Sequence, residues 1–196
     1  MCDMDPAHER TDSEVVRDTL VHKEAFAILM VRYEERLRRY VRRLGVRNEQ
    51  DQDDLLQDIF IKAYKNLHGF DQSLSFSSWI YRIAHNEAVS SFRRKNVRPE
   101  GNAVIDGDEV VRDIADSDDV MRDIISRHDG TLLTDALLRI DAKYRDIIVL
   151  RYFEGKEYEE IADILQMPVG SVATRIYRAK DRLRVLLAPK FSNVLS

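Results

Sequence analysis

The sequence predicts an all-α protein made of two small helical domains joined by an acidic linker. Glycine and proline are rare, with seven and four among 196 residues, and apolar residues recur at spacings of three and four over long stretches. Charged residues are unevenly distributed along the chain. Residues 21–97 carry fourteen bases and ten acids, residues 131–196 eleven bases and nine acids, and residues 98–130 only four bases against ten acids. Two basic helical domains therefore flank an acidic segment, although the whole chain has a net charge of -4.

The domain boundaries follow from periodicity and from breaker residues. The first nineteen residues lack helical periodicity, so we expect them to be disordered. Proline and glycine among acidic residues mark the linker. The predicted parts are a disordered N-terminal segment (1–19), a first helical domain (20–97), an acidic linker (98–117) and a second helical domain (118–190).

Three helices are predicted in the first domain. The first covers residues 20–44 and is followed by Gly45, which suits a helix C-cap. The second covers 52–67 and starts with acidic residues, which the helix dipole favours there. The third covers 76–95, after a loop at 68–75 rich in turn-forming residues. The side chains that we expect to be buried are Phe26, Met30, Tyr33, Leu37, Val41 and Leu44, then Leu56, Ile59, Phe60, Ala63, Tyr64 and Leu67, and finally Ile80, Ile83, Ala84, Ala88 and Phe92.

The second domain is predicted to be a helix-turn-helix (winged-helix-like) four-helix domain. Helices over 131–140 and 141–154 precede a short helix that begins near Tyr158, a turn closed by Pro168 and a final helix rich in arginine. That last helix has two faces. One is an apolar stripe made of Val172, Ile176, Ala179, Leu183 and Leu186. The other carries hydroxyl and guanidinium groups, which can reach bases and phosphates in a DNA major groove: Ser171, Thr174, Arg175, Arg178 and Arg182.

Composition excludes several classes of protein. Cys2 is the only cysteine, so the chain can form neither an internal disulfide framework nor a zinc site made of several thiolates, and a reducing cytoplasm fits. The longest purely apolar run, residues 25–31, is too short to span a bilayer, and the acidic N-terminus is unlike a secretory signal. We therefore expect no membrane insertion, no metal site and no cofactor.

Two pairs of motifs resemble a known family. Residues 54–63, from Asp54 to Ala63, and 76–86, with Trp79 in the motif, resemble the second conserved region of bacterial RNA polymerase sigma factors. Residues 144–162 and the stretch Pro168-Val-Gly-Ser-Val172 resemble the fourth region. The two regions occur in order with little between them. This compact form resembles the extracytoplasmic-function (ECF) group of the sigma-70 family, and the resemblance covers roughly 20–97 and 118–188.

The resemblance implies a function without catalysis. Members of this family bind core RNA polymerase and direct it to promoters. The helix at 52–67 would contact the β′ clamp through Asp54, Gln57 and Asp58, and the polymerase β flap is a second expected partner. Carboxylates and an amide on one helix face can pair with basic and polar groups of a partner helix. An anti-sigma factor is a further expected partner.

The resemblance also implies that the chain recognises two promoter elements in DNA. The first domain would recognise and open the −10 element, with the residues Arg82, His85, Asn86, Arg93 and Arg94 on the helix and Phe70, Asp71 and Ser73 in a loop that receives a flipped base. Trp79 is expected to be core rather than a stacking platform, because helical aromatics flanked by apolar residues are usually buried. The arginine-rich helix would read the −35 element. Members often have glycine at the position of Gln166 and serine at that of Glu157.

Three other functions compete with this one. A stand-alone helix-turn-helix regulator would need no polymerase, but the motif at 54–63 argues against it. A helical enzyme would have to use His68, His85 or the carboxylates of 51–58, and none of these has the spacing of a nucleophile–base pair or a metal site. An interaction protein such as an anti-sigma factor would need no arginine-lined recognition helix.

Overall fold

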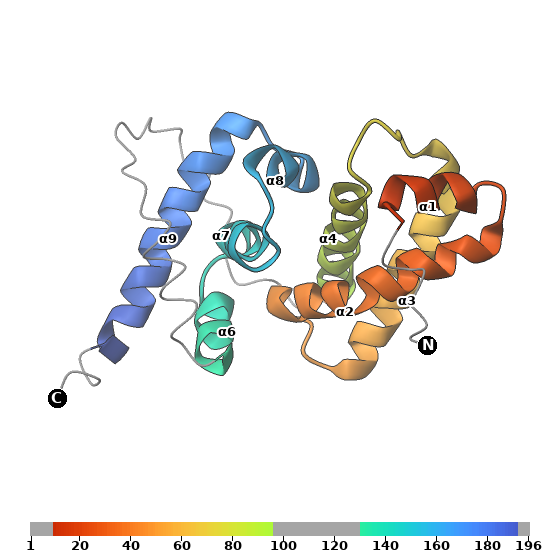
Figure 1. The fold of residues 1–196 in the computed structure, drawn as a ribbon. Coiled ribbons are helices and arrows are strands. Elements are labelled where there is room, and N and C mark those ends of the chain that lie inside the picture. Colours follow the sequence, from red (N-terminus) through yellow and green to blue (C-terminus); the bar gives the residue numbers. More distant parts are fainter. Residues whose placement is uncertain (1–9, 96–129, 192–196) are drawn as a thin grey trace, which may run out of the picture. The chain divides into compact units, whose positions relative to one another are not determined.

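The computed structural model describes residues 10–95 and 130–191, with the side chains of 130–134 and 187–191 left out of the description. The predicted linker at 98–117 lies outside these ranges. The described residues form two compact units, one built from α1 to α4 and the other from α6 to α9 (Figure 1). All regular secondary structure in the two described ranges is helical, as predicted, and they contain no strand that could form a wing. No helix in them is long and apolar enough to cross a lipid bilayer.

The first unit begins with an ordered helix that the sequence did not predict. Helix α1 spans Asp12–Thr19, so the expectation of disorder through residue 19 is wrong for these residues. A capping box holds its start. The backbone N–H of Glu14 donates to the Thr11 hydroxyl (3.3 Å), and the backbone N–H of Thr11 donates to the Glu14 carboxylate (2.7 Å). The Thr11 backbone N–H and hydroxyl both donate to the Glu14 carboxylate, and these two bonds lower the pKa of Glu14. Val15 and Val16 are fully buried, so tertiary packing stabilises a helix of only two turns.

Helix α2 spans Phe26–Leu44 and starts later than predicted. A turn and the short 3₁₀ helix η1 (Lys23–Ala25) separate it from α1. Gly45 follows with a φ of 119°, a backbone conformation that side-chain-bearing residues rarely adopt, so the predicted C-cap is confirmed.

Helices α3 (Glu49–Asn66) and α4 (Phe76–Arg94) complete the unit, with the short helix η2 (Leu67–Gly69) after α3. Asn48 caps α3 by accepting a hydrogen bond from the Asp51 N–H at 3.0 Å. Ion pairs join neighbouring helices, Arg38 with Asp53 between α2 and α3, and Lys62 with Glu87 between α3 and α4.

Most of the predicted core of this unit is buried, but four of its members are exposed or half-buried. The side chains of Met30 and Tyr64 are 40% and 38% exposed, although their spacing places them on the apolar faces of α2 and α3. Ile83 and Phe92 of α4 are half-buried. Periodicity therefore identified the apolar faces correctly, but part of those faces is left exposed in the described part of the chain.

The second unit contains α6 (Gly130–Arg139), α7 (Ala142–Ile148), α8 (Tyr158–Leu165) and α9 (Val169–Phe191). The single helix predicted over 141–154 is instead α7 followed by the wider π-helical turn η3 (Val149–Phe153). Helix α9 packs on both α7 and α8.

The turn between α8 and α9 contains a strained residue. Gln166 has φ and ψ of 53°, in the left-handed region that the resemblance assigns to glycine. An L-residue in this region costs about 1–2 kcal/mol. The Gln166 amide offsets part of this cost by donating to the Asp163 carbonyl at 2.6 Å, and the Met167 N–H donates to the Ala162 carbonyl at 3.0 Å.

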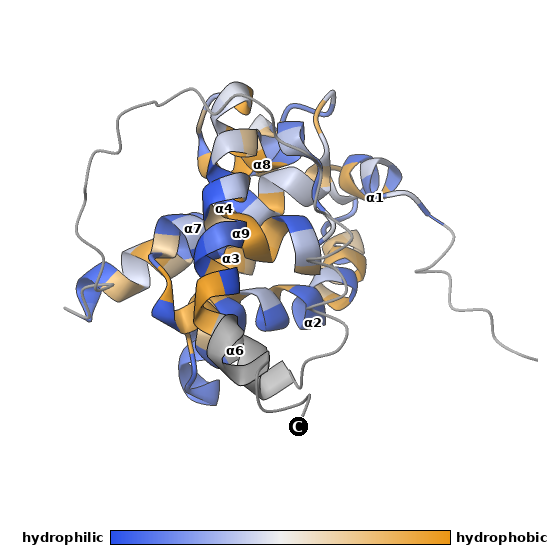
Figure 2. Cartoon of the chain, turned by 90° about the vertical axis from the view of Figure 1, so that its left-hand side faces the viewer, coloured by the Kyte–Doolittle hydropathy of each residue, from blue (hydrophilic) through white to orange (hydrophobic). Residues whose placement is uncertain are grey.

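The predicted apolar stripe of α9 is confirmed. Val172, Ile176, Ala179 and Leu183 are at most 2% exposed, and Leu186 is half-buried. Figure 2 accordingly shows both hydrophobic and hydrophilic residues along α9. This burial fixes which face of α9 is left for other contacts.

We expect Val16→Ala to lower the free energy of unfolding of the first unit by about 2 kcal/mol, because it removes two buried methyl groups and leaves a cavity. Val21→Ala is the matched control, since Val21 is 76% exposed, and we expect it to change stability by less than about 0.5 kcal/mol. Urea unfolding followed by the fluorescence of Trp79, the only tryptophan, measures both. Equal stability of the two variants would contradict the burial of α1.

Candidate functional sites

The three side chains predicted to contact a protein partner lie together on α3. Asp54, Gln57 and Asp58 are all exposed, and their spacing of three and one places them on one helix face. Leu55 and Leu56 between them are buried and anchor the helix from the other side. The α3 face therefore combines two carboxylates and an amide that are accessible to a partner.

An apolar groove of about 340 Å³ continues this face. Phe26 and Tyr64 meet edge to face across it, with ring centroids 5.2 Å apart, so α2 and α3 form its two walls. The groove is lined by Phe26, Met30, Gln57, Phe60, Ile61, Tyr64 and Lys65. This surface was not predicted from the sequence. The signal that could have revealed it is that α2 and α3 carry more apolar residues, among them Met30, Ile61 and Tyr64, than the core of the unit buries.

The predicted −10 loop stands on an aromatic cluster. Phe70, Phe76 and Trp79 pack with ring centroids 4.9–5.8 Å apart. Trp79 is 8% exposed, which confirms that it belongs to the core. Phe70 is equally buried, so the structure differs from the expectation that its side chain faces DNA. Phe70 lies at the base of the loop, because its ring gains more from stacking on two aromatics than from exposure to water.

The rim of the loop is an ordered turn. The backbone N–H of Ser73 donates to the Asp71 carboxylate at 2.9 Å, and the Leu74 N–H donates to the Asp71 carbonyl at 3.0 Å. Hydrogen bonds from Ser73, first from its backbone and then from its side chain, lower the pKa of Asp71. The Ser75 hydroxyl accepts from the Ser78 N–H at 3.3 Å at the start of α4. Asp71 and Ser73 are exposed, and these hydrogen bonds hold the turn that carries them in place.

Helix α4 places most of its predicted DNA contacts on one face. Arg82, His85, Asn86 and Arg93 follow the helical repeat, whereas Arg94 lies about a quarter turn away. Asn86 and Arg93 are exposed, and Arg82 and His85 are half-buried. His85 is positioned by Tyr40 of α2, whose hydroxyl lies 3.4 Å from its Nδ1.

Most of the predicted −35 contacts of helix α9 lie beside its buried apolar stripe, at the edge of the face that is exposed to solvent. Ser171, Thr174, Arg175 and Arg178 are half-buried. Arg182 lies two turns further from the helix start than Arg175, 3.3 Å from Asp141 and 4.5 Å above the Tyr144 ring, so it also ties α9 to α7. Sequence reasoning missed Tyr177, which is 42% exposed beside Thr174 and Arg178.

No group of three or more His, Cys, Asp or Glu side chains within residues 10–95 and 130–191 has a geometry that could hold a metal ion.

Comparison with known proteins matches both units. The family model "Sigma-70 region 2" matches residues 29–98, and "Sigma-70, region 4" matches 131–183. The chain is 32% identical over 166 residues to the ECF RNA polymerase sigma factor SigW of Bacillus subtilis (strain 168), covering 83% of this chain and 88% of SigW. It is 31% identical over 188 residues to the ECF RNA polymerase sigma-E factor of Haemophilus influenzae, covering 93% and 98%.

Solved structures show the same similarity. CnrH, solved in complex with the cytosolic domain of CnrY, has a TM-score of 0.67 and 26% identity, covering 91% of this chain and 97% of that chain. The sigma factor RpoE of Bartonella quintana, solved with the anti-sigma factor NepR, shares the fold with a TM-score of 0.63 at 24% identity, over 83% of this chain and 96% of that one.

Proposed function

We propose that this chain, which belongs to the extracytoplasmic-function group of the sigma-70 family, binds core RNA polymerase and directs it to promoters in the cytoplasm. The observation that carries the proposal is the presence, in order, of a unit matched by region 2 and a helix-turn-helix unit matched by region 4. The proposed role needs no catalytic residue, because the chemistry belongs to the polymerase.

The two units have different roles in promoter recognition. The first, predicted from the sequence over 20–97, binds polymerase and opens the −10 element, and the second, over 118–190, reads the −35 element. Each small unit alone offers few phosphate contacts, so the free chain binds DNA weakly. Once both units are held on polymerase, the linker at 98–117 sets an effective concentration for the second contact.

The polymerase surface of the first unit combines charge and apolar area. Asp54 and Asp58 pair with basic groups of the β′ clamp, and Gln57 supplies an amide at the boundary with the groove. The groove receives apolar side chains of the clamp, because it adjoins the charged face and the described residues leave it open. The buried apolar contacts supply affinity, and the rim charges set orientation and the rate of association.

The DNA surface of the first unit uses α4 and the loop before it. Arg82, Arg93 and Arg94 contact phosphates, while Asn86 offers paired hydrogen bonds to a base edge and His85 a further contact. Asp71 and Ser73 form the rim that receives the flipped base, above the floor provided by Phe70. A rim held by its own hydrogen bonds loses little conformational entropy when it binds the base.

The DNA surface of the second unit is the flank of α9. Ser171, Thr174, Arg175 and Arg178 contact bases and phosphates of the −35 element, with Tyr177 as an added apolar contact. Arg182 contacts the backbone and holds α9 on α7 at the same time. Contact with the β flap belongs to this unit as well.

An anti-sigma factor is the expected regulator. RpoE of Bartonella quintana, which is similar to this chain, was solved with the anti-sigma factor NepR, and the similar CnrH was solved with the cytosolic domain of CnrY. A regulator of this kind blocks the chain by covering the groove and the α3 face, which also bind polymerase.

The function is tested by transcription. Purified chain and bacterial core RNA polymerase are mixed with genomic DNA fragments, and the 5′ ends of the transcripts are sequenced. We expect discrete starts that share a pair of upstream motifs. Absence of specific starts with polymerase from the same species would favour the stand-alone regulator instead.

We expect Ile61→Glu to weaken binding to core polymerase by about tenfold or more, because a carboxylate placed in the apolar groove loses hydration when the partner docks. Val31→Glu is the control. Val31 is 71% exposed on the same unit and does not line the groove, so its affinity should stay near that of the parent. Competition for labelled core polymerase measures both, and equal affinities of the two variants would remove the groove from the interface.

We expect Arg178→Ala to weaken binding of the polymerase complex to a −35 duplex by about 1–3 kcal/mol, the range for a lost base contact. Arg184→Ala removes the same charge from an exposed position on another face of α9 and should have a smaller effect. Fluorescence anisotropy at fixed salt compares the two variants. Equal losses would mean that only the charge of α9, not the position of Arg178, matters.

A further inference from the structure

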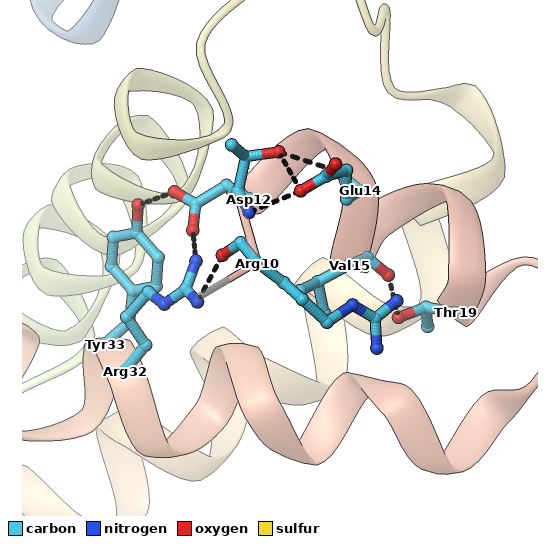
Figure 3. Close-up of polar contacts among 8 residues, drawn as sticks. Arg10, Asp12, Glu14, Val15, Thr19, Arg32 and Tyr33 are labelled. Atoms are coloured by element: carbon cyan, nitrogen blue, oxygen red, sulfur yellow. Dashed lines mark hydrogen bonds and ion pairs between the residues drawn. The ribbon is translucent and has the colours of Figure 1, made fainter. Parts of the chain in front are cut away.

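The Asp12 carboxylate attaches α1 to α2. It accepts hydrogen bonds from the Arg32 guanidinium and from the Tyr33 hydroxyl, two consecutive residues of α2 (Figure 3). Arg32 also donates to the Arg10 carbonyl at 2.7 Å, so the start of α1 is held at two points. The side chains of Asp12 and Arg32 are only 24% and 22% exposed, which limits screening of this ion pair by water and salt.

Tyr33 carries this attachment on to α4. Its ring meets the Phe76 ring edge to face at 5.5 Å, and its hydroxyl also bonds the Ser77 side chain. Burial and the bond to Asp12 raise the pKa of Tyr33, so the hydroxyl keeps its single proton at neutral pH. Because Asp12 takes that proton, Ser77 has to be the donor in the second bond. Loss of Asp12 would therefore redirect the Tyr33 proton and change the bonding at the first turn of α4.

The first turn of α4 is also one end of the −10 loop. Phe76 directly follows the loop and Phe70 is the first residue of its 70–75 segment, and both rings pack on Trp79. The two ends of the loop are thus held by one aromatic cluster, and Tyr33 packs against that cluster from α2. A chain of direct contacts leads from Asp12 through Tyr33 and Phe76 to the stem of the loop.

We propose that Asp12 is a positioning residue for promoter opening, which holds the stem of the 70–75 loop in the geometry that receives a −10 base. The proposal rests on the proposed function of this loop. Asp12 lies outside residues 29–98, the part matched by the region 2 family model, whereas Tyr33 and the loop lie within it. The inference therefore comes from the contacts of α1 and not from the matched region.

The test compares Asp12→Ala with Asp18→Ala in the complex with core polymerase. Asp18 is an acid of the same helix that pairs with Arg10 at 3.0 Å and does not contact Tyr33. Affinity for a single-stranded −10 oligonucleotide is measured beside affinities for core polymerase and for a −35 duplex. We expect Asp12→Ala to weaken oligonucleotide binding by about tenfold, with the other two affinities unchanged. Asp18→Ala should behave like the parent in all three assays.

Tyr33→Phe is the second variant, because it keeps the ring against Phe76 and removes only the hydroxyl. We expect it to reproduce the loss in oligonucleotide binding and, like Asp12→Ala, to change the emission of Trp79. A merely stabilising role of α1 would leave the oligonucleotide affinity of folded Asp12→Ala and Tyr33→Phe equal to that of the parent, and this result would overturn the proposal. If the parent complex itself bound no −10 oligonucleotide, the proposed function of the loop would fail instead.

Discussion

Three aromatic residues spaced by seven along α2 are the constraint on which the surfaces of the first unit depend. A spacing of seven keeps them on one helix face, and each ring meets a ring of another helix. The pairs are Phe26 with Tyr64 of α3, Tyr33 with Phe76 of α4, and Tyr40 with Tyr81 of α4. The first pair spans the apolar groove, the second supports the loop stem, and Tyr40 of the third positions His85. One stripe of rings thus sets three surfaces, so a change in the tilt of α2 would alter all of them together.

How much the sequence could predict depended on whether a feature was local or tertiary. The stripe of α9 was predictable because four of its five members, Val172, Ile176, Ala179 and Leu183, are buried within their own unit. Met30 and Tyr64 were predicted to be buried because periodicity reveals an apolar face but not whether anything covers it. Helix α1 was missed because eight residues give a weak periodic signal, and its stability comes from distant partners such as Arg32. Phe70 was predicted to contact DNA as part of the loop that receives a flipped base, because position in a loop does not reveal the direction of a side chain.

The second unit tolerates departures from the family pattern by local compensation. Gln166 occupies a left-handed turn position without being glycine, and its own amide bonds the preceding helix. Glu157 stands where many members of the family have a serine cap. The Glu157 backbone N–H donates to the Glu160 carboxylate at 3.0 Å, and the Glu157 side chain pairs with Arg151 at 2.8 Å. Both substitutions lie at the ends of α8. Local hydrogen bonds therefore hold both ends of α8 although the residues there differ from the family pattern.

The open groove between α2 and α3 also bears on how much of this protein a cell can hold. Its lining includes Met30, Ile61 and Tyr64, which are 38–44% exposed in the free chain. Exposed apolar patches of this kind favour self-association, and the tendency grows with concentration. Copies made in excess of their partners would be the first to aggregate or to be degraded. Synthesis of the chain is therefore best matched to that of a covering protein, and co-expression from one transcript would achieve this balance.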